Sequence, residues 1–284
     1  MSRHTKAILF ILLEAAGFSL MSFFVRMAGD LPTMEKAFFR NAVAAVIAAV
    51  VLFRSEERFS FRKDSLPLLM LRSLFGVIGI LANFTAIDRL AIADANILNK
   101  LAPFFAILMS VFILKEMPKK LDILCVILAF AGALFVIRPT RGVASLPSLI
   151  GAFGGFSAGT AYTILRKLRL RDERGPVIVF FFSVFSMLVC LPQMLFSFKP
   201  MSSMQFIWLL CAGMAAALGQ LSVTKAYSLA PAKEISVFDY SQVIFAGIWG
   251  AAFLHEIPDR MSFAGYAVII TAAVMRWYAA NRST

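Results

Sequence analysis

The segment Ala93–Pro118 reads ADANILNKLAPFFAILMSVFILKEMP, and it decides the fold. Apolar residues dominate this segment, which is long enough for a helix to cross a bilayer core of roughly 30 Å. One stripe is polar, because Asn96, Asn99, Lys100 and Pro103 recur at helical spacing and share one face. A lysine this deep in a span costs roughly 2.5–3.5 kcal/mol on insertion scales, so we expect this face to meet protein or water rather than lipid.

The end of this segment returns in the second half of the chain. The sequence LKEMP at Leu114–Pro118 recurs as LHEIP at Leu254–Pro258, an offset of 140 positions that we call the repeat shift. Under this shift, without a gap, the polar stripe Asn96, Asn99, Lys100 and Pro103 falls on Ser236, Asp239, Tyr240 and Val243. The polar face is kept while its chemistry changes. We therefore predict an internal repeat of about half the chain.

Composition restricts the class of protein. The chain has 284 residues, of which 60% are hydrophobic and 15% are charged, against about 25% charged in soluble domains. The formal charge of +12 lies in short linkers between apolar runs, the pattern of cytoplasmic membrane loops. No polar stretch is long enough to fold as a nucleic-acid-binding module. Cys125, Cys190 and Cys211 all lie in apolar runs without a CxxC pair, which favours packing over a metal site or disulfide.

The apolar runs predict an all-α integral membrane protein with ten transmembrane helices. The predicted spans are 6–26, 36–53, 67–87, 92–113, 121–137, 146–165, 176–197, 205–228, 234–254 and 261–279. With the N-terminus in the cytoplasm, seventeen of the 28 lysines and arginines fall inside and seven fall outside. This asymmetry predicts a multi-pass protein of the cell (inner) membrane with both termini cytoplasmic.

The repeat shift covers five predicted spans. Because five is odd, the second copy must be inserted upside down relative to the first. We therefore expect two inverted five-helix repeats, residues 1–140 and 141–284, which together form one transport domain. Inverted repeats are a common construction of secondary transporters, because two copies that exchange conformations give inward-open and outward-open states.

Three stretches resemble a known family. They are LRSLFG at 71–76, LAIADA at 90–95 followed by LAP at 101–103, and the span ends at Glu116 and Glu256. With them, nearly the whole chain resembles the ten-span, EamA-type members of the drug/metabolite transporter superfamily. The resemblance implies a carrier or exporter of small solutes such as amino acids, other metabolites or drugs. It also implies a central cavity between the two halves.

Three ionisable residues inside predicted spans are candidates for the transport site. Glu14 is a candidate proton site or contact for a substrate amine, the alternative being a buried structural hydrogen bond. Lys100 and Asp239 are expected at levels roughly 10 Å apart, so no direct salt bridge is expected without helix unwinding. A substrate with both an ammonium and a carboxylate group could span this gap. Alternatively, each residue pairs with a neighbour such as Asn96 or Tyr240.

Neutral polar side chains also lie at mid-membrane depth. The predicted substrate-binding residues among them are Asn83, Asn96, Asn99, Tyr162, Gln220 and Tyr240. As a set they favour a wet cavity, although each one alone fits a hydrogen bond between helices equally well. Arg40 and Arg72 lie near span ends, where their side chains can snorkel to the interface or face a cavity. Glu116 and Glu256, next to prolines, are interpreted as interfacial structure.

One motif suggests catalysis but lies in the wrong context. Gly155–Gly159, GFSAG, matches the GxSxG of hydrolases, which requires a strand-to-helix turn and a histidine base. Here it lies inside an apolar span, and the histidines are His4 and His255. With Gly151, these glycines instead predict close helix packing. The sequence contains no P-loop and no metal-ligand cluster, so we expect neither ATP hydrolysis nor a cofactor or metal.

These features favour a secondary transporter, not an enzyme. We expect it to move an amino acid or related metabolite across the plasma membrane by alternating access, with export favoured. Its partners would be a small-molecule substrate and the lipid bilayer, and protons could couple through Glu14 or Asp239. The alternatives are an intramembrane enzyme acting on a lipid-like substrate and a non-transporting membrane sensor. No motif encodes the substrate, the direction of transport, the coupling ion or the oligomeric state.

Overall fold

The computed structural model describes residues 3–56, 59–137, 146–196, 198–229 and 236–282. The predicted boundary between residues 140 and 141 lies outside this part of the chain, as do Arg138, Arg141 and Lys233 of the charge count. Across the described residues the secondary structure is helical, without strands. Nine helical segments in these ranges are long and apolar enough to cross a membrane. The expectation of an all-α membrane protein is thus confirmed.

The helices follow the predicted apolar runs closely. The α-helices are α1 (Arg3–Met27), α2 (Thr33–Phe53), α3 (Leu66–Arg89), α4 (Ile92–Asn99), α5 (Ala102–Ile113), α6 (Lys120–Ile137), α7 (Leu146–Arg169), α8 (Gly175–Phe196), α9 (Ser203–Leu229), α11 (Ser241–Leu254) and α12 (Arg260–Arg282). Two short 3₁₀ helices, η1 (Lys63–Ser65) and η2 (Ser236–Tyr240), precede α3 and α11. α12 coincides with the tenth predicted span but is not among the nine segments above.

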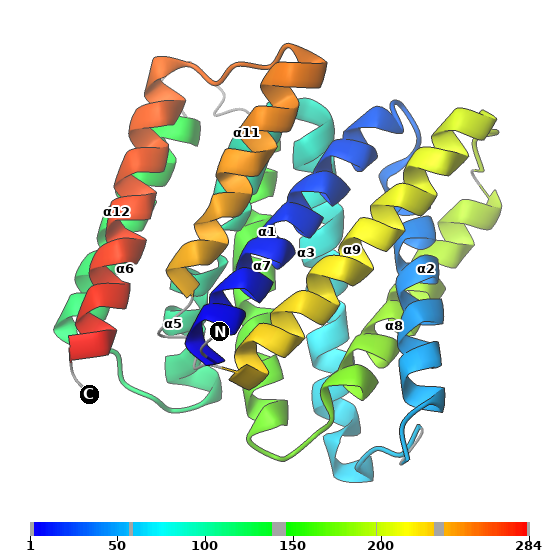
Figure 1. Cartoon of the computed structure of the whole chain (residues 1–284), viewed down its shortest axis with the longest axis horizontal. Coiled ribbons are helices and arrows are strands. Elements are labelled where there is room, and N and C mark those ends of the chain that lie inside the picture. The colour runs from blue at the N-terminus through cyan, green and yellow to red at the C-terminus, as the bar shows by residue number, and fades with distance from the viewer. Residues whose placement is uncertain (1–2, 57–58, 138–145, 197, 230–235, 283–284) are drawn as a thin grey trace.

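The helices lie side by side, and α12 ends at the same end of the bundle where α1 begins (Figure 1). The main packing pairs are α1 with α9, α3 with α7, α2 with α8, and α6 with α12. The repeat shift places α1 on α7 and α3 on α9, so the first two pairs are equivalent. In the same way, the packing of α1 on α11 corresponds to that of α7 on α5.

The two copies of the repeated pentapeptide end their helices in the same way. Lys115 and His255, which the repeat shift relates, both have left-handed backbone conformations, with φ of 59° and 55°. The N–H groups of Glu116 and Glu256 then bond back to carbonyls in the last helical turn, at 3.2 and 3.0 Å. This pattern caps the carbonyls of a helix C-terminus, and the proline two residues later cannot extend the helix. The sequence repeat is therefore also a repeat of local structure.

The predicted span 92–113 is not one helix, because it is interrupted at Lys100 and Leu101 between α4 and α5. Pro103 lacks an N–H group and cannot bond the carbonyl of Asn99, as a continuous helix would require. The N–H of Phe104 donates to Leu101 at 3.0 Å rather than to Lys100. The Lys100 carbonyl is thus released from the helical pattern. The later predicted span, 234–254, is also divided, into η2 and α11.

The glycine-rich face of α7 packs against this interruption. A Cβ atom on Gly155 would lie 2.7 Å from the carbonyl oxygen of Leu98, and one on Gly159 would lie 2.5 Å from that of Ala102. Only glycine allows the two backbones to approach so closely. The structure therefore confirms that the GFSAG run packs helices, and it places α7 directly behind the break between α4 and α5.

Candidate functional site

The two helix interruptions meet at an ion pair. The Lys100 Nζ lies 2.6 Å from Asp239 Oδ1, and both side chains are largely buried. The expected gap of roughly 10 Å between their levels is wrong, and the contact forms where both predicted spans are interrupted, the condition under which a direct salt bridge was expected. The expected gap assumed two continuous α-helices with a rise of about 1.5 Å per residue, whereas the break after α4 and the 3₁₀ turn of η2 change both the level and the direction of the chain.

Glu14, from the middle of α1, completes a cluster of three ionisable groups. It is 3% exposed, and its carboxyl group lies beside that of Asp239. Two neighbouring carboxyl groups can form a hydrogen bond only when one of them holds a proton, because two carboxylates accept but do not donate. The Oε2 atom of Glu14 has no partner among the described residues. The cluster therefore combines a lysine, a carboxylate and a carboxyl group that can hold a proton.

Tyr240 ties the two interruptions together. Its hydroxyl group donates a hydrogen bond of 3.1 Å to the carbonyl of Lys100, which Pro103 has released from the helix. Tyr240 is 4% exposed, so this bond is shielded from water and lipid. In a membrane interior, a freed backbone carbonyl must find a partner inside the protein. The tyrosine hydroxyl supplies it from the other half of the chain.

Tyr162, on α7, faces this cluster. Its side chain is 47% exposed, yet it lies within electrostatic reach of Lys100, Asp239 and Glu14. It is also within reach of Arg72. Of the neutral residues selected from the sequence, Tyr162 thus lies near the charged cluster.

Asn96 belongs to a separate, closed network. Its amide nitrogen donates to the Ile92 carbonyl at 2.8 Å, and its oxygen accepts from Ser22 at 3.3 Å and from the amide of Gln242. Ser22, Asn96 and Gln242 are all buried. These bonds join α1, α4 and α11. The Asn96 oxygen accepts two of them, which fills its capacity as a hydrogen-bond acceptor. Neither Ser22 nor Gln242 is unusual in a membrane helix, so the sequence pattern alone does not point to these two residues.

The remaining predicted site residues lie outside the cluster. Asn83 is buried on α3, and its Oδ1 has no partner within the described part of the chain. Asn99 ends α4 and is partly buried. Gln220 lines a narrow, mainly apolar crevice between α2, α8 and α9, whose lining includes none of the three ionisable residues. Arg40 and Arg72 are buried rather than snorkelling, at 3% and 6% exposed.

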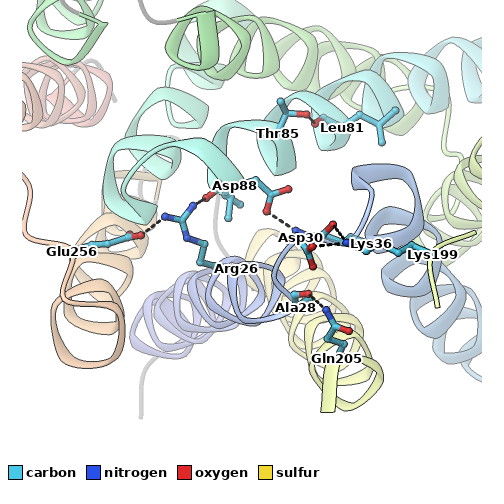
Figure 2. A network of polar contacts seen from close by, with 11 residues as sticks. Arg26, Ala28, Asp30, Lys36, Leu81, Thr85, Asp88, Lys199, Gln205 and Glu256 are labelled. Carbon is cyan, nitrogen blue, oxygen red and sulfur yellow. Dashed lines mark hydrogen bonds and ion pairs between the residues drawn. The ribbon is translucent and has the colours of Figure 1, made fainter. Parts of the chain in front are cut away.

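At one end of the bundle, charged side chains join neighbouring elements (Figure 2). Arg26, at the end of α1, forms an ion pair of 2.5 Å with Glu256 and also donates to the Ile87 carbonyl. The second oxygen of Glu256 accepts the N–H of Ile92 at 3.0 Å. Beside this pair, Lys36 of α2 binds Asp88 of α3 at 2.5 Å, with the lysine fully buried.

The same end carries a polar pocket of about 510 Å³, lined by residues that include Arg26, Asp30, Asp88 and Arg89. Asp30, in the loop between α1 and α2, forms an exposed ion pair with Lys199. The hydrogen bond and positive charge of Lys199 lower the pKa of the Asp30 carboxyl below its ordinary value. The Asp30 carboxyl group is therefore ionised around neutral pH and does not titrate there.

An equivalent ion pair lies at the opposite end of the bundle. Glu116 binds Arg166 at 2.9 Å, and the repeat shift relates Glu116 to Glu256 and Arg166 to Arg26. α1 and α11 end at the top of Figure 1, whereas α7 ends at the bottom. The Arg26–Glu256 side chains are 27% and 16% exposed, but those of Arg166 and Glu116 are 60% and 44% exposed. The two related pairs thus differ in burial.

Comparison with known proteins gives consistent results. The EamA-like transporter family matches residues 5–138 and, a second time, residues 146–277. The chain is 29% identical over 270 residues to the pseudopaline exporter of Pseudomonas aeruginosa, covering 94% of each chain. It is 24% identical to an uncharacterized transporter of Helicobacter pylori, covering 93% of this chain and 92% of the relative. It is 23% identical to human solute carrier family 35 member G1, covering 96% and 80%.

A solved crystal structure has the same fold, with a TM-score of 0.67, 15% identity, and coverage of 98% of this chain and 99% of the other. The family and the names of the relatives indicate a transporter rather than an enzyme. With its membrane-spanning helices and two family matches, this chain belongs to the EamA-like transporter family of the drug/metabolite transporter superfamily.

Proposed function

We propose that this protein is a secondary transporter that moves a small metabolite across the plasma membrane by alternating access. The observation that carries the proposal is the ion pair between Lys100 and Asp239, joined by Glu14, where two helices are interrupted. Secondary transporters place substrate and coupling ions at the membrane midplane, beside discontinuous helices. Ionisable groups at this depth are costly and mark substrate or ion paths.

The working parts of this transporter are two inverted five-helix halves, residues 1–140 and 141–284. Three observations support them. Residues related by the repeat shift have the same unusual backbone conformation, as at Lys115 and His255. The packing of α1 on α9 has its counterpart in the packing of α7 on α3. The family matches each half separately. Five spans per half then require opposite orientations.

The two equivalent ion pairs act as alternating gates. In the present conformation the Arg26–Glu256 pair is the more buried one, and Arg166–Glu116 is open to solvent. Each pair joins one half to the other, because Arg26 and Glu116 belong to the first half and Arg166 and Glu256 to the second. When the halves exchange conformations, the burial of the two pairs exchanges as well. Access to the central cluster then changes from one side of the membrane to the other.

Protons couple to transport through the contact between Glu14 and Asp239. A carboxyl pair holds one proton while its members touch, and separation of the two groups favours release of that proton. Glu14 lies on α1 and Asp239 on η2, so a movement between the halves changes their contact. A proton is thereby exchanged for substrate in each cycle.

The substrate class is amino acids or related metabolites, and the direction is export. A relative of similar length is named as an exporter of pseudopaline, which supports this direction. The excess of lysine and arginine on the side of both termini supports cytoplasmic termini and a plasma (inner) membrane location.

The test is transport by liposomes containing the purified full chain, with substrates selected by thermal stabilisation. Lys100→Met and Asp239→Asn are expected to abolish saturable transport, whereas Glu56→Gln, an exposed change, retains it. Removing one partner of a buried pair costs about 3–5 kcal/mol, so the single variants are also expected to be less stable. The double variant Lys100→Met/Asp239→Leu regains stability without transport. Transport by this double variant at the wild-type rate would contradict the assignment.

A further inference from the structure

Within the part of the chain that the structure describes, two buried arginines lie close together without a carboxylate partner. Arg40 of α2 and Arg72 of α3 both face the ring of Phe182 on α8, with guanidinium carbons 5.9 and 4.0 Å from the ring centre. They are close enough to repel each other. Among the described residues, no aspartate or glutamate lies within electrostatic reach of either guanidinium group, and Tyr162 is a neighbour of both.

The hydrogen-bonding capacity of this pair is largely unused. Arg40 Nη1 donates a hydrogen bond to the side-chain oxygen of Asn41 at 2.6 Å. The side-chain amide of Asn41 in turn donates to the hydroxyl group of Ser186 at 2.7 Å. Arg40 Nε, Arg72 Nε and Arg72 Nη1 are buried and find no acceptor within the described ranges. The hydroxyl groups of Ser73 and Ser183, adjacent in sequence to Arg72 and Phe182, are also buried without a partner there.

A purely structural role does not account for this arrangement. Buried charges in proteins are normally paired, because desolvation of an isolated charge is expensive. The other buried cations among the described residues are paired, since Lys36 binds Asp88 and Lys100 binds Asp239. The cation–π contact with Phe182 compensates only part of the cost for one guanidinium group. Two adjacent unpaired guanidinium groups therefore form a site that lacks an anion.

We propose that Arg40 and Arg72 bind a carboxylate group of the transported substrate. This inference rests on the proposed transport function and specifies the substrate class of the same site. Guanidinium groups present planar donors that match the two oxygens of a carboxylate. The ring of Phe182 lies beside both guanidinium groups and brings them to the same place in the fold.

Tyr162 connects this anion site to the central cluster. It lies within electrostatic reach of Arg40 and Arg72 on one side and of Lys100 and Asp239 on the other. Since Lys100 and Asp239 already neutralise each other, the free positive charge belongs to the arginines. A substrate with its carboxylate on the arginines therefore directs its other end toward Glu14, whose Oε2 has no partner among the described residues. This polarity fits an amino acid or an amino-acid derivative that retains a free carboxylate.

The test measures binding to the purified full chain in detergent by thermal unfolding. The probes are the twenty amino acids, and for each compound that stabilises the protein, its methyl ester and its decarboxylated amine. We expect the free acid to bind on the order of tenfold to a hundredfold more tightly than the ester. Arg40→Gln and Arg72→Gln should each remove this preference. Arg54→Gln, an exposed arginine that follows the helix of Arg40, should retain it.

A second readout separates binding from folding. Because each substitution relieves repulsion between two unpaired charges, the ligand-free Tm of Arg40→Gln and Arg72→Gln should not fall below that of the wild type. A lower Tm together with an unchanged preference for the acid would show that the arginines are structural. A folded wild type that no free acid stabilises would also overturn the anion site.

Failure of the transport proposal gives a different result. If liposomes transport esters or amines as well as acids, and the two arginine variants transport them at the wild-type rate, the protein is a transporter and the anion site is wrong. If no stabilising compound crosses the membrane, the transport proposal fails. The dependence of binding on the carboxylate and on Arg40 and Arg72 is still decided by the unfolding measurement.

Discussion

The hydroxyl group of Tyr240 donates a hydrogen bond to the main-chain carbonyl of Lys100, its own counterpart under the repeat shift. This carbonyl is free because Pro103 interrupts the helix that would otherwise bond it. The side chain of a residue in one repeat thus supplies a hydrogen bond to the main-chain carbonyl of its counterpart in the other repeat. The bond holds the two interrupted helices together next to the Lys100–Asp239 ion pair, so the local chemistry of a proline determines where the charged cluster forms.

Tyr240→Phe should destabilise the protein by about 1–3 kcal/mol, because it leaves a buried carbonyl without a donor while preserving the ring. The measurement is the free energy of unfolding in detergent. Tyr278→Phe is the matched control, since Tyr278 is half exposed on α12, and its effect should be smaller than that of Tyr240→Phe. Equal stability of the two variants would show that the carbonyl of Lys100 finds another partner.

Gly159→Ala should be destabilising and should reduce transport. Its new Cβ atom would lie 2.5 Å from the Ala102 carbonyl oxygen, so α7 must move away from the break between α4 and α5. Such overpacking typically costs about 1–3 kcal/mol. Gly247→Ala on α11 makes the same chemical change where the nearest neighbouring atom, Ala93 Cβ, is 4.0 Å away, and it should be neutral or slightly stabilising. Thermal unfolding of both variants distinguishes a packing requirement from a general sensitivity to alanine.

Glu256→Gln and Glu116→Gln should have different effects, although the two residues are equivalent in the repeat. The Arg26–Glu256 pair is largely buried, so its loss weakens this closed end, whereas exposed pairs such as Arg166–Glu116 contribute only about 0–1 kcal/mol. The reporter is Thr85→Cys, in the polar pocket beside Arg26, after replacement of the native cysteines. Labelling by a membrane-impermeant thiol reagent should accelerate with Glu256→Gln. Equal labelling in both variants would contradict the assignment of the gates.

Glu14→Gln should separate substrate exchange from proton coupling. Glutamine can occupy the same space but cannot release a proton, so exchange of substrate across liposomes should persist at reduced affinity. Accumulation driven by an imposed pH difference should be lost. Asp30 should not contribute to this pH-driven accumulation, because its pKa is lowered. The stabilisation from its pair with Lys199 is lost only as the pH falls through that lowered pKa. Accumulation by the variant at the wild-type level would exclude Glu14 as the proton site.

The sequence predicted the membrane class, most helix positions and the equivalence of positions related by the repeat shift, because hydrophobic length and motif repetition are local properties. It also selected Glu14, Lys100 and Asp239. It did not predict the contact between Lys100 and Asp239, since their separation was calculated for continuous helices and Pro103 was treated only as part of a polar face. The pairing of Arg26 with Glu256 was also missed. The repeat itself relates Arg26 to Arg166 and Glu256 to Glu116, and applying the shift to charged residues near span ends would have revealed both pairs.

For Arg40 and Arg72, the sequence leaves the orientation of the side chains open for a different reason. Each lies a few residues inside its span, where a long side chain can reach the interface, so position along the helix favours snorkelling. The structure turns both side chains inward onto Phe182, a residue far away in sequence. Rotation about the helix axis depends on packing against neighbouring helices, and it is not encoded by depth in the span.

The most direct test of the transport mechanism is counterflow in liposomes that contain the purified protein. The vesicles are loaded with an excess of the unlabelled compound that best stabilises the protein and are diluted into a trace of the same compound carrying a label. Alternating access predicts a transient accumulation of label above its equilibrium level, because outward movement of unlabelled compound returns the site to the outside. This overshoot should be absent in Lys100→Met/Asp239→Leu. Equilibration of label without an overshoot, or no protein-dependent entry at all, would contradict the account.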